Sequence, residues 1–494
     1  MPGPVGGDQG QIDEVFEYDT DLFGCCVTNF VTWHIDGRGS ETTHSYDANG
    51  NRLQTVHPIP SIVEGFEHNA FGQLNEQTLP DNGSSHRRVD KFTYYGPADG
   101  CMNGYLKEEI IDDPGFALTT NYEYDCLGRI IRKIDPRGHD SLTEYNALDQ
   151  VVRSSSRRVS DPNGVRYIGL IYYDFNDKVV RRDLPNVDDL DVLQPNTDFT
   201  TLYEYDILNF MTRKCSEVGD YMGTIPGPVE LPDCTGLPDN AFITVEYEYD
   251  SNRNQTLVRS GEATEGRQPG NVVQTDYDER DLVFRTTQTP GDPNQSTDQV
   301  DYDGNGNVVR THQGLEDTPR VTENLYDGYD RLIQVVDIMG NTGEIHYDGN
   351  NNMTSKRVED ELIDIGGDAG NIRLDETTYT YDLMDRRTLT ITEFFDTVTQ
   401  ADIQGGQQLG ESHIDIGYSD NSQVIQITDD NQHAANFIYD SANRISVGID
   451  PKANSTTYGY DQNSNVITIT ETEKSDLLNR DEIFVTGYTY DNLD

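Results

Sequence analysis

The chain has 494 residues, of which 34% are hydrophobic, and its formal net charge is −52. So acidic a chain is a poor partner for nucleic acid, because phosphate binding needs clustered Lys and Arg. The hydrophobic fraction lies below the ~45–50% of globular domains, which argues against one large core but allows a thin sheet that buries one face. No apolar run reaches the roughly 18 residues of a membrane-spanning helix, so we expect no membrane span in this segment.

Disorder is the competing interpretation for a chain of this polarity. The regular spacing of tyrosines and β-branched residues argues against it. The acidity itself fits a saline habitat, weak divalent-cation binding or simple solubility, and solvation is the favoured reading.

A short Tyr-Asp motif recurs along the chain, with clear copies in Tyr46-Asp47-Ala48-Asn49-Gly50 and Tyr124-Asp125-Cys126-Leu127-Gly128. Several copies, such as those at Tyr418, Tyr439 and Tyr460, follow one another at steps of 21 residues, which predicts a repeat architecture. The motif tyrosines, including three degenerate copies at the end, are Tyr18, Tyr46, Tyr124, Tyr173, Tyr205, Tyr249, Tyr277, Tyr302, Tyr326, Tyr347, Tyr381, Tyr439, Tyr460, Tyr490, Tyr145, Tyr418 and the His68-Asn69 pair.

Each repeat is predicted to be a β-hairpin. Polar and aromatic or β-branched residues alternate before the Asp, as in 245–249, which is typical of a half-buried strand. The Asp opens a turn, and three residues later comes a residue type that tolerates a left-handed backbone, which fits a type I turn closed by a left-handed residue. These residues are Gly50, Gly128, Gly306, Asn209, Asn351, Asn443, Asp177, Asp281, Asp330 and Asp385.

We take the motif positions as the structural site of the chain. They are represented by Tyr46, Asp47, Gly50, Arg52, Tyr124, Asp125, Gly128, Arg129, Tyr302, Asp303, Gly306, Tyr326, Asp327, Arg331, Tyr439, Asp440, Arg444, Tyr460 and Asp461. The basic residue after the turn (Arg52, Arg129, Lys178, Arg331, Arg386 or Arg444) is either a ligand-binding row or, as we prefer, a partner for carboxylates on neighbouring strands. Glu123, Glu204 and Glu248 are the expected carboxylates.

In chain order, residues 1–45 form an opening segment with a degenerate repeat and the single Trp33, and residues 46–494 form the hairpin array. A Gly- and Pro-rich excursion at 94–104 interrupts the array, and insertions at 183–198, 218–240 and 358–375 are expected on its surface. The sequence stops inside a turn at Asp491, so we expect a fragment of a longer protein. Its sheet edge near 488–490 should then be paired by missing repeats or neighbouring subunits, and should self-associate without them.

The six cysteines give no Cys-x-x-Cys pair, so zinc and thioredoxin-like chemistry have no support. Cys215 and Cys234 flank the insertion at 218–240 and either close it as a disulfide or remain buried thiols. No pairing is predicted for Cys25, Cys26, Cys101 and Cys126.

No cofactor or catalytic site is predicted. Asp303-Gly304-Asn305-Gly306-Asn307 resembles the start of a calcium loop, but it lacks the later Gly and Glu and coincides with a repeat turn. Weak Ca²⁺ binding at acidic loops such as 188–191 competes with simple solvation. His139, His312, His346 and His433 fall on strand ends or turns without a metal-binding spacing, so we expect no enzyme.

The pattern Tyr-x-Tyr-Asp-x-x-Gly-Arg-Leu followed by Asp-Pro-x-Gly closely resembles the Rhs or YD-repeat family, from Tyr46 to Asp494. That family includes bacterial Rhs toxins, the cocoon-forming subunits of Tc toxins and the animal teneurins. The resemblance implies an all-β fold in which repetitive antiparallel hairpins form a continuous spiralling sheet around a hollow, with stacked tyrosines. The autoproteolytic aspartate pair and variable toxin of family members are not visible here, so cleavage is carried over onto no residue.

Two structural roles follow from the resemblance. In the favoured one, the segment belongs to a large secreted or cell-surface protein whose shell encapsulates a polymorphic toxin or other cargo. In the alternative, the same spiral is an extracellular adhesion or filament-forming protein that binds glycans or a partner protein through its acidic insertions. Both place the chain outside the cell or on its surface.

Overall fold

The computed structural model describes residues 11–19, 30–83, 86–157, 166–187, 193–218, 234, 237, 241–361, 371–396, 398–401, 410–475 and 480–490. Cys25, Cys26, the acidic loop 188–191, most of the insertion at 218–240 and the last four residues lie outside these ranges. The chain divides into two compact units, one formed by residues 1–140 and 339–492 and the other by residues 141–338. We call them unit 1 and unit 2.

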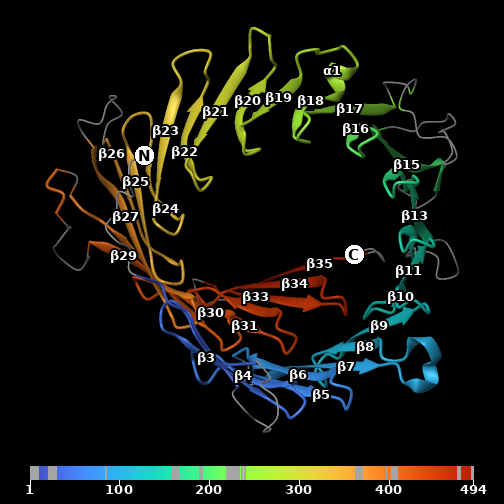
Figure 1. The fold of residues 1–494 in the computed structure, drawn as a ribbon. Coiled ribbons are helices and arrows are strands. Elements are labelled where there is room, and N and C mark those ends of the chain that lie inside the picture. The colour runs from blue at the N-terminus through green and yellow to red at the C-terminus, as the bar shows by residue number, and fades with distance from the viewer. Residues whose placement is uncertain are drawn as a thin grey trace. The chain divides into compact units, whose positions relative to one another are not determined.

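Unit 1 holds two groups of strands, which we call its N-terminal run and its C-terminal run (Figure 1). The N-terminal run consists of β1 (Val15–Tyr18), β2 (Val31–Ile35), β3 (Glu41–Tyr46), β4 (Arg52–Val56), β5 (Val63–His68), β6 (Leu74–Asp81), β7 (Arg87–Tyr94), the short 3-10 helix η1 (Pro97–Met102), β8 (Leu106–Ile111), β9 (Leu118–Tyr124) and β10 (Ile130–Ile134). The C-terminal run consists of β25 (Thr342–Tyr347), β26 (Met353–Glu361), β27 (Asn371–Tyr381), β28 (Arg387–Glu393), β29 (Glu411–Tyr418), β30 (Val424–Asp429), β31 (Ala434–Tyr439), β32 (Ile445–Ile449), β33 (Ser455–Tyr460), β34 (Val466–Glu473) and β35 (Glu482–Gly487).

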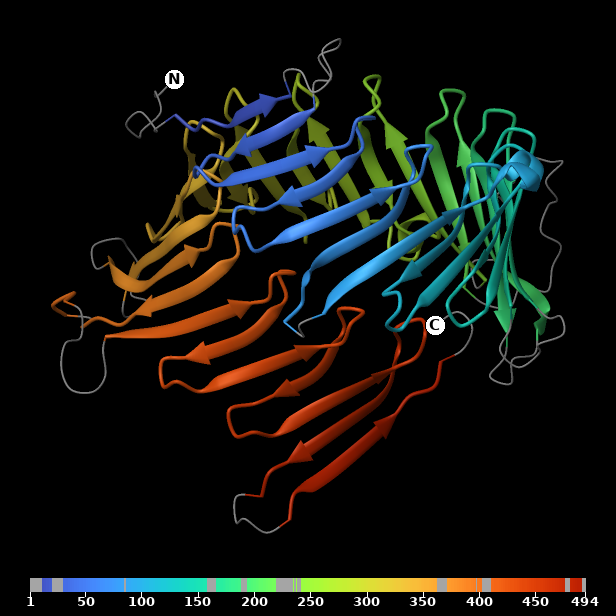
Figure 2. The same ribbon diagram turned by 90° about the horizontal axis from the view of Figure 1, so that it is seen from below.

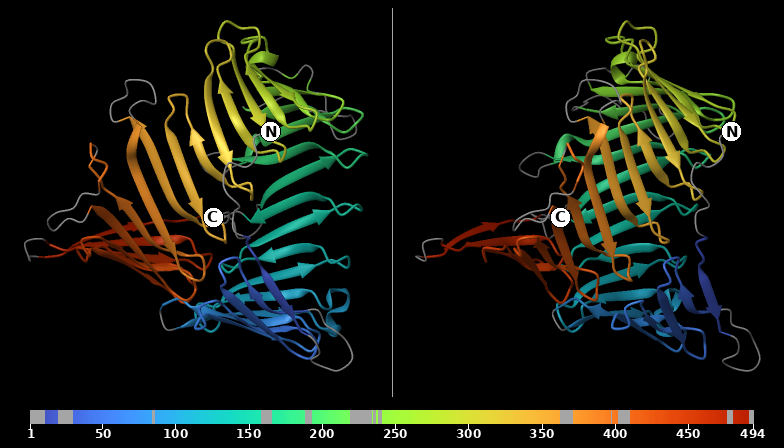
Figure 3. Two further views of the ribbon diagram at one scale, coloured as in Figure 1. Left: turned by 60° about the vertical axis from the view of Figure 1, so that its left-hand side comes forward. Right: turned by 90° about the vertical axis from the view of Figure 1, so that its left-hand side faces the viewer.

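Unit 2 holds the strands between these two runs, in green to yellow in Figure 3. They are β11 (Asp140–Tyr145), β12 (Val151–Arg157), β13 (Arg166–Tyr173), β14 (Val179–Val187), β15 (Leu193–Tyr205), β16 (Met211–Glu217), β17 (Phe242–Tyr249), β18 (Gln255–Arg259), the one-turn helix α1 (Gly261–Thr264), β19 (Val272–Tyr277), β20 (Val283–Gln288), β21 (Ser296–Tyr302), β22 (Val308–Gln313), β23 (Arg320–Tyr326) and β24 (Leu332–Val336).

Every strand pairs antiparallel with the next strand along the chain within each run of unit 1 and within unit 2. The 35 strands of the described residues belong to one sheet, and η1 and α1 are the helices found among those residues. The predicted all-β fold of repetitive antiparallel hairpins is therefore confirmed. Residues 1–45 contribute β1, β2 and most of β3, which pair into the same ladder.

The hairpin turns have the conformation that the sequence predicts. In the β31–β32 hairpin, the Asn443 N–H donates to Asp440 O at 3.0 Å and the Asp440 N–H donates to Arg444 O at 2.8 Å. The register shifts between Ile438 and Tyr439, so the turn ends in a bulge next to the motif tyrosine. Asn443 has a φ of 68°, and the other nine residues predicted to be left-handed also have positive φ, between 59° and 91°. Asx-type bonding by the Asp and a left-handed third residue thus fix the hairpin locally.

The interior is thin, as expected from the composition. Few apolar side chains are fully buried in the described residues, and one cluster in unit 2 gathers Leu202, Cys215, Cys234, Ala241 and Phe242. Cys215 and Cys234 form a disulfide there, which decides between the two predicted states of these cysteines. A second disulfide, which the sequence did not predict, joins Cys101 in η1 to Cys126 in the next hairpin turn.

Candidate functional site

The turn aspartates each organise their own hairpin end. The Asp440 Oδ1 accepts from the Arg444 N–H at 2.9 Å, and its Oδ2 accepts from Arg444 Nε at 2.8 Å. Asp47 makes the same pattern with Asn51, and Asp303 makes it with Asn307, which confirms the turn reading of the calcium-like segment. A hydrogen bond from the Asn51 side chain, with others from the backbone, lowers the pKa of Asp47 below its usual value.

The arginine after the turn has a different partner from the one we predicted. Arg129, Arg331, Arg386 and Arg444 each pair with the Asp of their own turn, four residues earlier. Arg386 and Arg444 also donate to backbone carbonyls of the next turn, those of Ser419 and Asp461. The tight turn brings the fourth residue back over the Asp, so the guanidinium reaches that carboxylate first.

The expected glutamates pair instead with arginines further along the second strand of their own hairpin. Glu123 pairs with Arg132, Glu204 with Arg213 and Glu248 with Arg259. Arg52 stands one position later than the others relative to its Asp, and its guanidinium lies 4.5 Å from the centre of the Phe66 ring. The interpretation of the post-turn arginines as a ligand-binding row is therefore not supported for the four that pair with the Asp of their own turn.

The motif tyrosines join each hairpin to the one before it. The Tyr439 hydroxyl donates to Val424 O at 2.9 Å, and Val424 is the first residue of β30, the second strand of the preceding hairpin. Thirteen tyrosines, Tyr439 included, make this contact with the first residue of the corresponding strand. The donor and acceptor pairs are Tyr46–Val31, Tyr94–Leu74, Tyr173–Val151, Tyr205–Val179, Tyr249–Met211, Tyr277–Gln255, Tyr302–Val283, Tyr326–Val308, Tyr381–Met353, Tyr418–Arg387, Tyr439–Val424, Tyr460–Ile445 and Tyr490–Val466.

Two tyrosines depart from the simple correspondence between the Tyr-Asp motif and this set of hydroxyl-to-carbonyl bonds, which we call the phenol ladder: Tyr94, which is not among the predicted motif tyrosines, and Tyr124. Tyr94 takes the motif role although the long excursion at 95–105, which contains η1, replaces the usual short turn after it. Tyr124 belongs to a clear motif copy, yet its ring stacks on Tyr105 at 5.0 Å and meets Tyr95 edge to face. The sequence signal that could have identified Tyr94 is its alternation with Phe92 along β7. Tyr95, the second tyrosine of the Tyr-Tyr pair, lies after the end of that strand.

Successive hairpin turns are also hydrogen-bonded to one another along the row of turns at the strand ends. In unit 2, Asn305 and Asn307 both donate from Nδ2 to the Asp330 carboxylate of the next turn, at 2.8 and 2.7 Å. Arg280 donates to Asp303 O at 2.8 Å in the same sense. Each turn therefore holds its neighbour, and the edge becomes a continuous polar network.

In unit 1 the turns of the C-terminal run lie against the loops that connect hairpins in the N-terminal run. In Figure 2 the N-terminal run, in blue, lies beside the C-terminal run, in orange to red. Asn82, which is 2% exposed, donates to Asp440 O at 2.7 Å and to Asn443 Oδ1 at 2.9 Å. Asn463 donates to Asp135 Oδ2 at 2.7 Å, and the bonded residues along this contact are 314 to 361 positions apart in sequence. We call this contact the inter-run junction.

Charged groups at the inter-run junction have partners, and one of them, Asp112, is buried. The Ser441 hydroxyl donates to Asp112 Oδ2 at 2.6 Å, and Asp112 is 4% exposed. Arg38 pairs with Asp348 at 3.3 Å and with Asp385 at 2.6 Å, and donates to Asp382 O at 2.8 Å. Buried carboxylates of this kind are retained only when hydrogen bonds satisfy them, so the junction is a specific contact.

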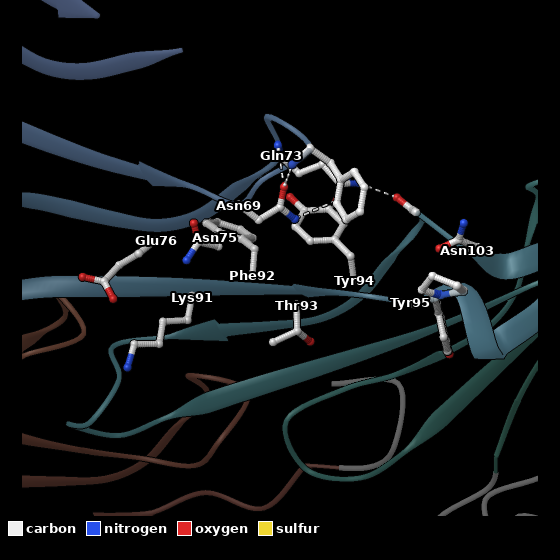
Figure 4. Close-up of a pocket in the computed structure, with 14 residues that line it drawn as sticks. Asn69, Gln73, Asn75, Glu76, Lys91, Phe92, Thr93, Tyr94, Tyr95 and Asn103 are labelled. Carbon is white, nitrogen blue, oxygen red and sulfur yellow. Dashed lines mark hydrogen bonds between the residues drawn. The ribbon is translucent and has the colours of Figure 1, made fainter. Parts of the chain in front are cut away.

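A hollow of about 650 Å³ opens beside the turn of the β5–β6 hairpin in unit 1 (Figure 4). Its lining includes Phe71 at the turn tip and Phe92 and Tyr94 of β7. Figure 4 shows Phe92 and Tyr94 leaving β7 on the same side as Asn69 and Gln73, whereas Lys91 and Thr93 leave it on the other.

Two of the histidines for which no catalytic or metal-binding role is predicted contact nearby aspartates. His312 contacts the Asp301 carboxylate at 3.0 Å, and His433 contacts that of Asp429 at 3.0 Å. Among the residues that the structure describes, no group of His, Cys, Asp and Glu is arranged to hold a metal ion. Over those same residues, no helix is long and apolar enough to cross a bilayer.

No protein-family model and no curated protein matches this chain. Among solved structures, the chain is similar to one described as TcdB2-TccC3-Cdc42, with 13% identity and a TM-score of 0.51. It is also similar to the Tc holotoxin pore of Photorhabdus luminescens, with 12% identity and a TM-score of 0.55. The matches cover 90% and 95% of this chain and 25% of each of those chains, so it spans a quarter of their length. At such identities the likeness is one of fold.

Proposed function

We propose that this chain is a wall segment of a hollow β-shell that encloses a toxin or other cargo in a large secreted or cell-surface protein. The observation that carries the proposal is the inter-run junction in unit 1. A flat strip of hairpins has contacts only between sequence neighbours, whereas here Asn82 and Asn463 bond to residues 358 and 328 positions away. Side-by-side packing of distant runs is what a wall requires, because it closes the gap between the strand ends of one run and those of the next.

The fold shared with Tc toxin structures supports the same role. In this proposal the partners are further parts of the same longer chain or neighbouring subunits, together with the enclosed cargo. The two disulfides, Cys101–Cys126 and Cys215–Cys234, support an extracellular or cell-surface location, since disulfides persist in oxidising compartments.

A structural role rather than catalysis fits how the polar side chains are used. The carboxylates of turn aspartates such as Asp440 and Asp461 accept hydrogen bonds from their own turns. The phenols of the tyrosine ladder donate to backbone carbonyls. Groups that are committed in this way are not free to act as a nucleophile or a base.

Protease protection in the complete protein tests this proposal. If the wall encloses cargo, the cargo segment should resist protease in the native protein. It should become accessible when the junction is weakened by Asn82→Leu together with Asn463→Leu. The control is Asn305→Leu, which removes an amide of the same kind from a turn in unit 2. A cargo that is digested at the same rate in native and junction-weakened protein, or growth of the native protein into fibres, would refute the shell role.

A further inference from the structure

Hollows form at the same position of the repeat in both units. In unit 1 a hollow of about 650 Å³ lies between the β5–β6 turn and the next hairpin, β7–β8. In unit 2 a hollow of about 610 Å³ lies between the β13–β14 turn and the next hairpin, β15–β16. Both volumes fall within the ~300–1,000 Å³ of pockets that hold small ligands.

Three aromatic rings in equivalent positions line each hollow, and Tyr95 adds a fourth in unit 1. A phenylalanine occupies the turn tip, Phe71 in unit 1 and Phe175 in unit 2, and the two are 83% and 107% exposed. The next hairpin adds its ladder tyrosine and the aromatic residue two positions earlier. These pairs are Phe92 with Tyr94, and Tyr203 with Tyr205.

The rings are placed to receive a flat apolar face. Side chains two positions apart in a strand project from the same face of the sheet, so the two aromatic rings that each strand contributes lie side by side. The turn itself does not need the tip phenylalanine, since Asn305 stands at an equivalent tip in a turn of the same geometry. A ligand that covers an exposed ring removes apolar surface from water, which makes the free energy of binding more favourable.

Side-chain amides stand beside these rings and are held in place. In unit 1, Asn69 Nδ2 donates to Gln73 Oε1 at 2.8 Å, and Gln73 Nε2 donates to Gly104 O at 2.7 Å. In unit 2, Asn176 Nδ2 donates to Asn209 Oδ1 at 3.1 Å. Amides carry both donors and acceptors, which complements the hydroxyl groups of a ligand.

The wall of the unit 1 hollow is fixed before any ligand arrives. The Gly104 N–H donates to Tyr95 O, and the Tyr95 N–H donates to Tyr105 O, both at 2.9 Å. The Cys101–Cys126 disulfide ties the same excursion to the following turn. A wall ordered in advance lowers the entropy cost of binding.

Charge excludes anionic ligands from both hollows. Lys91 is the cation in the described lining of the unit 1 hollow, and Asp113 already pairs with it. In the unit 2 hollow, the Asp174 and Asp206 carboxylates accept from their own turn backbones, and Glu204 pairs with Arg213. A net charge of −52 repels phosphate and sulfate groups further.

From the recurring rings, the fixed amides and the absence of a free cation in the described lining, we infer that both hollows bind neutral saccharides. One face of a pyranose ring stacks on the aromatic rings, and its hydroxyls bond to the amides. This binding is independent of the shell role, because it uses exposed side chains that take no part in the inter-run junction.

Ligand titration of the full chain tests the inference. The probes are neutral trisaccharides of glucose, galactose, mannose and N-acetylglucosamine, followed by saturation-transfer NMR and calorimetry. At least one should bind, and Phe71→Ala combined with Phe175→Ala should weaken it about tenfold, as expected for loss of ring stacking. Leu127→Ala is the control, because Leu127 is a turn-tip side chain that is 69% exposed and lines neither hollow.

Circular dichroism of the variants separates loss of binding from loss of fold, and these exposed substitutions should leave the spectrum unchanged. A sulfated form of the bound trisaccharide should bind more weakly than the neutral form. Absence of binding by every trisaccharide at millimolar concentration would overturn the inference. Equal loss in the Leu127→Ala control, or selective capture of an apolar peptide in place of sugar, would overturn it as well.

Discussion

Replacing Tyr439 by Phe isolates one contact of the phenol ladder. The ring and its packing remain, and the hydroxyl that donates to Val424 O at 2.9 Å is lost. The backbone ladder between β30 and β31 covers only Gln426–Asn436 to Thr428–Ala434, so Val424 O lies beyond its end and depends on the phenol.

The cost follows from the environment of the bond. A neutral hydrogen bond contributes about 0.5–1.5 kcal/mol, and a half-buried carbonyl regains part of it from water, so we expect about 1 kcal/mol of local stability to be lost. Native-state hydrogen exchange resolves such local openings, whereas a global melt of a repeat array does not. Amides of β30 and β31 should therefore exchange about fivefold faster in Tyr439→Phe.

Tyr458→Phe is the matched control. Tyr458 lies in β33 outside the motif position, at the same spacing before Tyr460 as Phe437 before Tyr439. Its substitution should leave exchange at the β30–β31 boundary unchanged. Exchange in Tyr439→Phe at the wild-type rate, or equal acceleration in both variants, would show that the phenol does not hold adjacent hairpins together.

Three further outcomes follow from the same contacts. Asn82→Leu should cost about 1–3 kcal/mol, because it removes the buried amide that donates to Asn443 Oδ1 and one of the two donors to Asp440 O. Limited proteolysis should then cut unit 1 faster, and an unchanged rate would contradict the junction. The hydrogen bonds that Arg129 donates hold the folded pKa of Asp125 below 3.8, so the contribution of Asp125 to folding stability is complete above that pH and is lost as the pH falls below it. Burial raises the pKa of Tyr122 to about 12, so the contribution of Tyr122 to folding stability is lost as the pH rises from 10 to 12. Urea unfolding across pH should show each loss as a difference between the native sequence and its Asp125→Asn or Tyr122→Phe variant, and a difference that stays flat at either end would be inconsistent with the respective shift. The all-exposed strand β35 has no further strand beside it among the described residues, so the chain should self-associate in light scattering, and Ile483→Lys should reduce the association; a concentration-independent monomer would argue that the edge is capped.

The hairpins could be predicted from sequence because their determinants are local. An Asp followed three residues later by Gly128 or Asn443 specifies both the Asx bonding and the left-handed closure within one turn. Alternation of residues before the Asp then places the strand. No information from elsewhere in the chain is needed.

The contacts between hairpins were less accessible. Arg444 both returns to Asp440 and donates to Asp461 O of the next turn, which depends on the exact path of the two turns, and the prediction named neither contact. The Cys101–Cys126 disulfide depends on η1 folding over the next turn, which a long Gly- and Pro-rich excursion does not reveal. The junction at Asn82 depends on how many hairpins separate two runs, and no local pattern contains that number.

In the thirteen described pairs of the phenol ladder the acceptor is a main-chain carbonyl, such as Val424 O or Ile445 O, rather than a particular side chain. The residue that supplies the carbonyl can therefore be Val, Ile, Leu, Met, Arg or Gln without loss of the bond, as the thirteen pairs show. A hairpin that brings its own tyrosine can follow any other hairpin. The array is consequently modular, and whole hairpins can be added, removed or exchanged during evolution without matching changes in their neighbours.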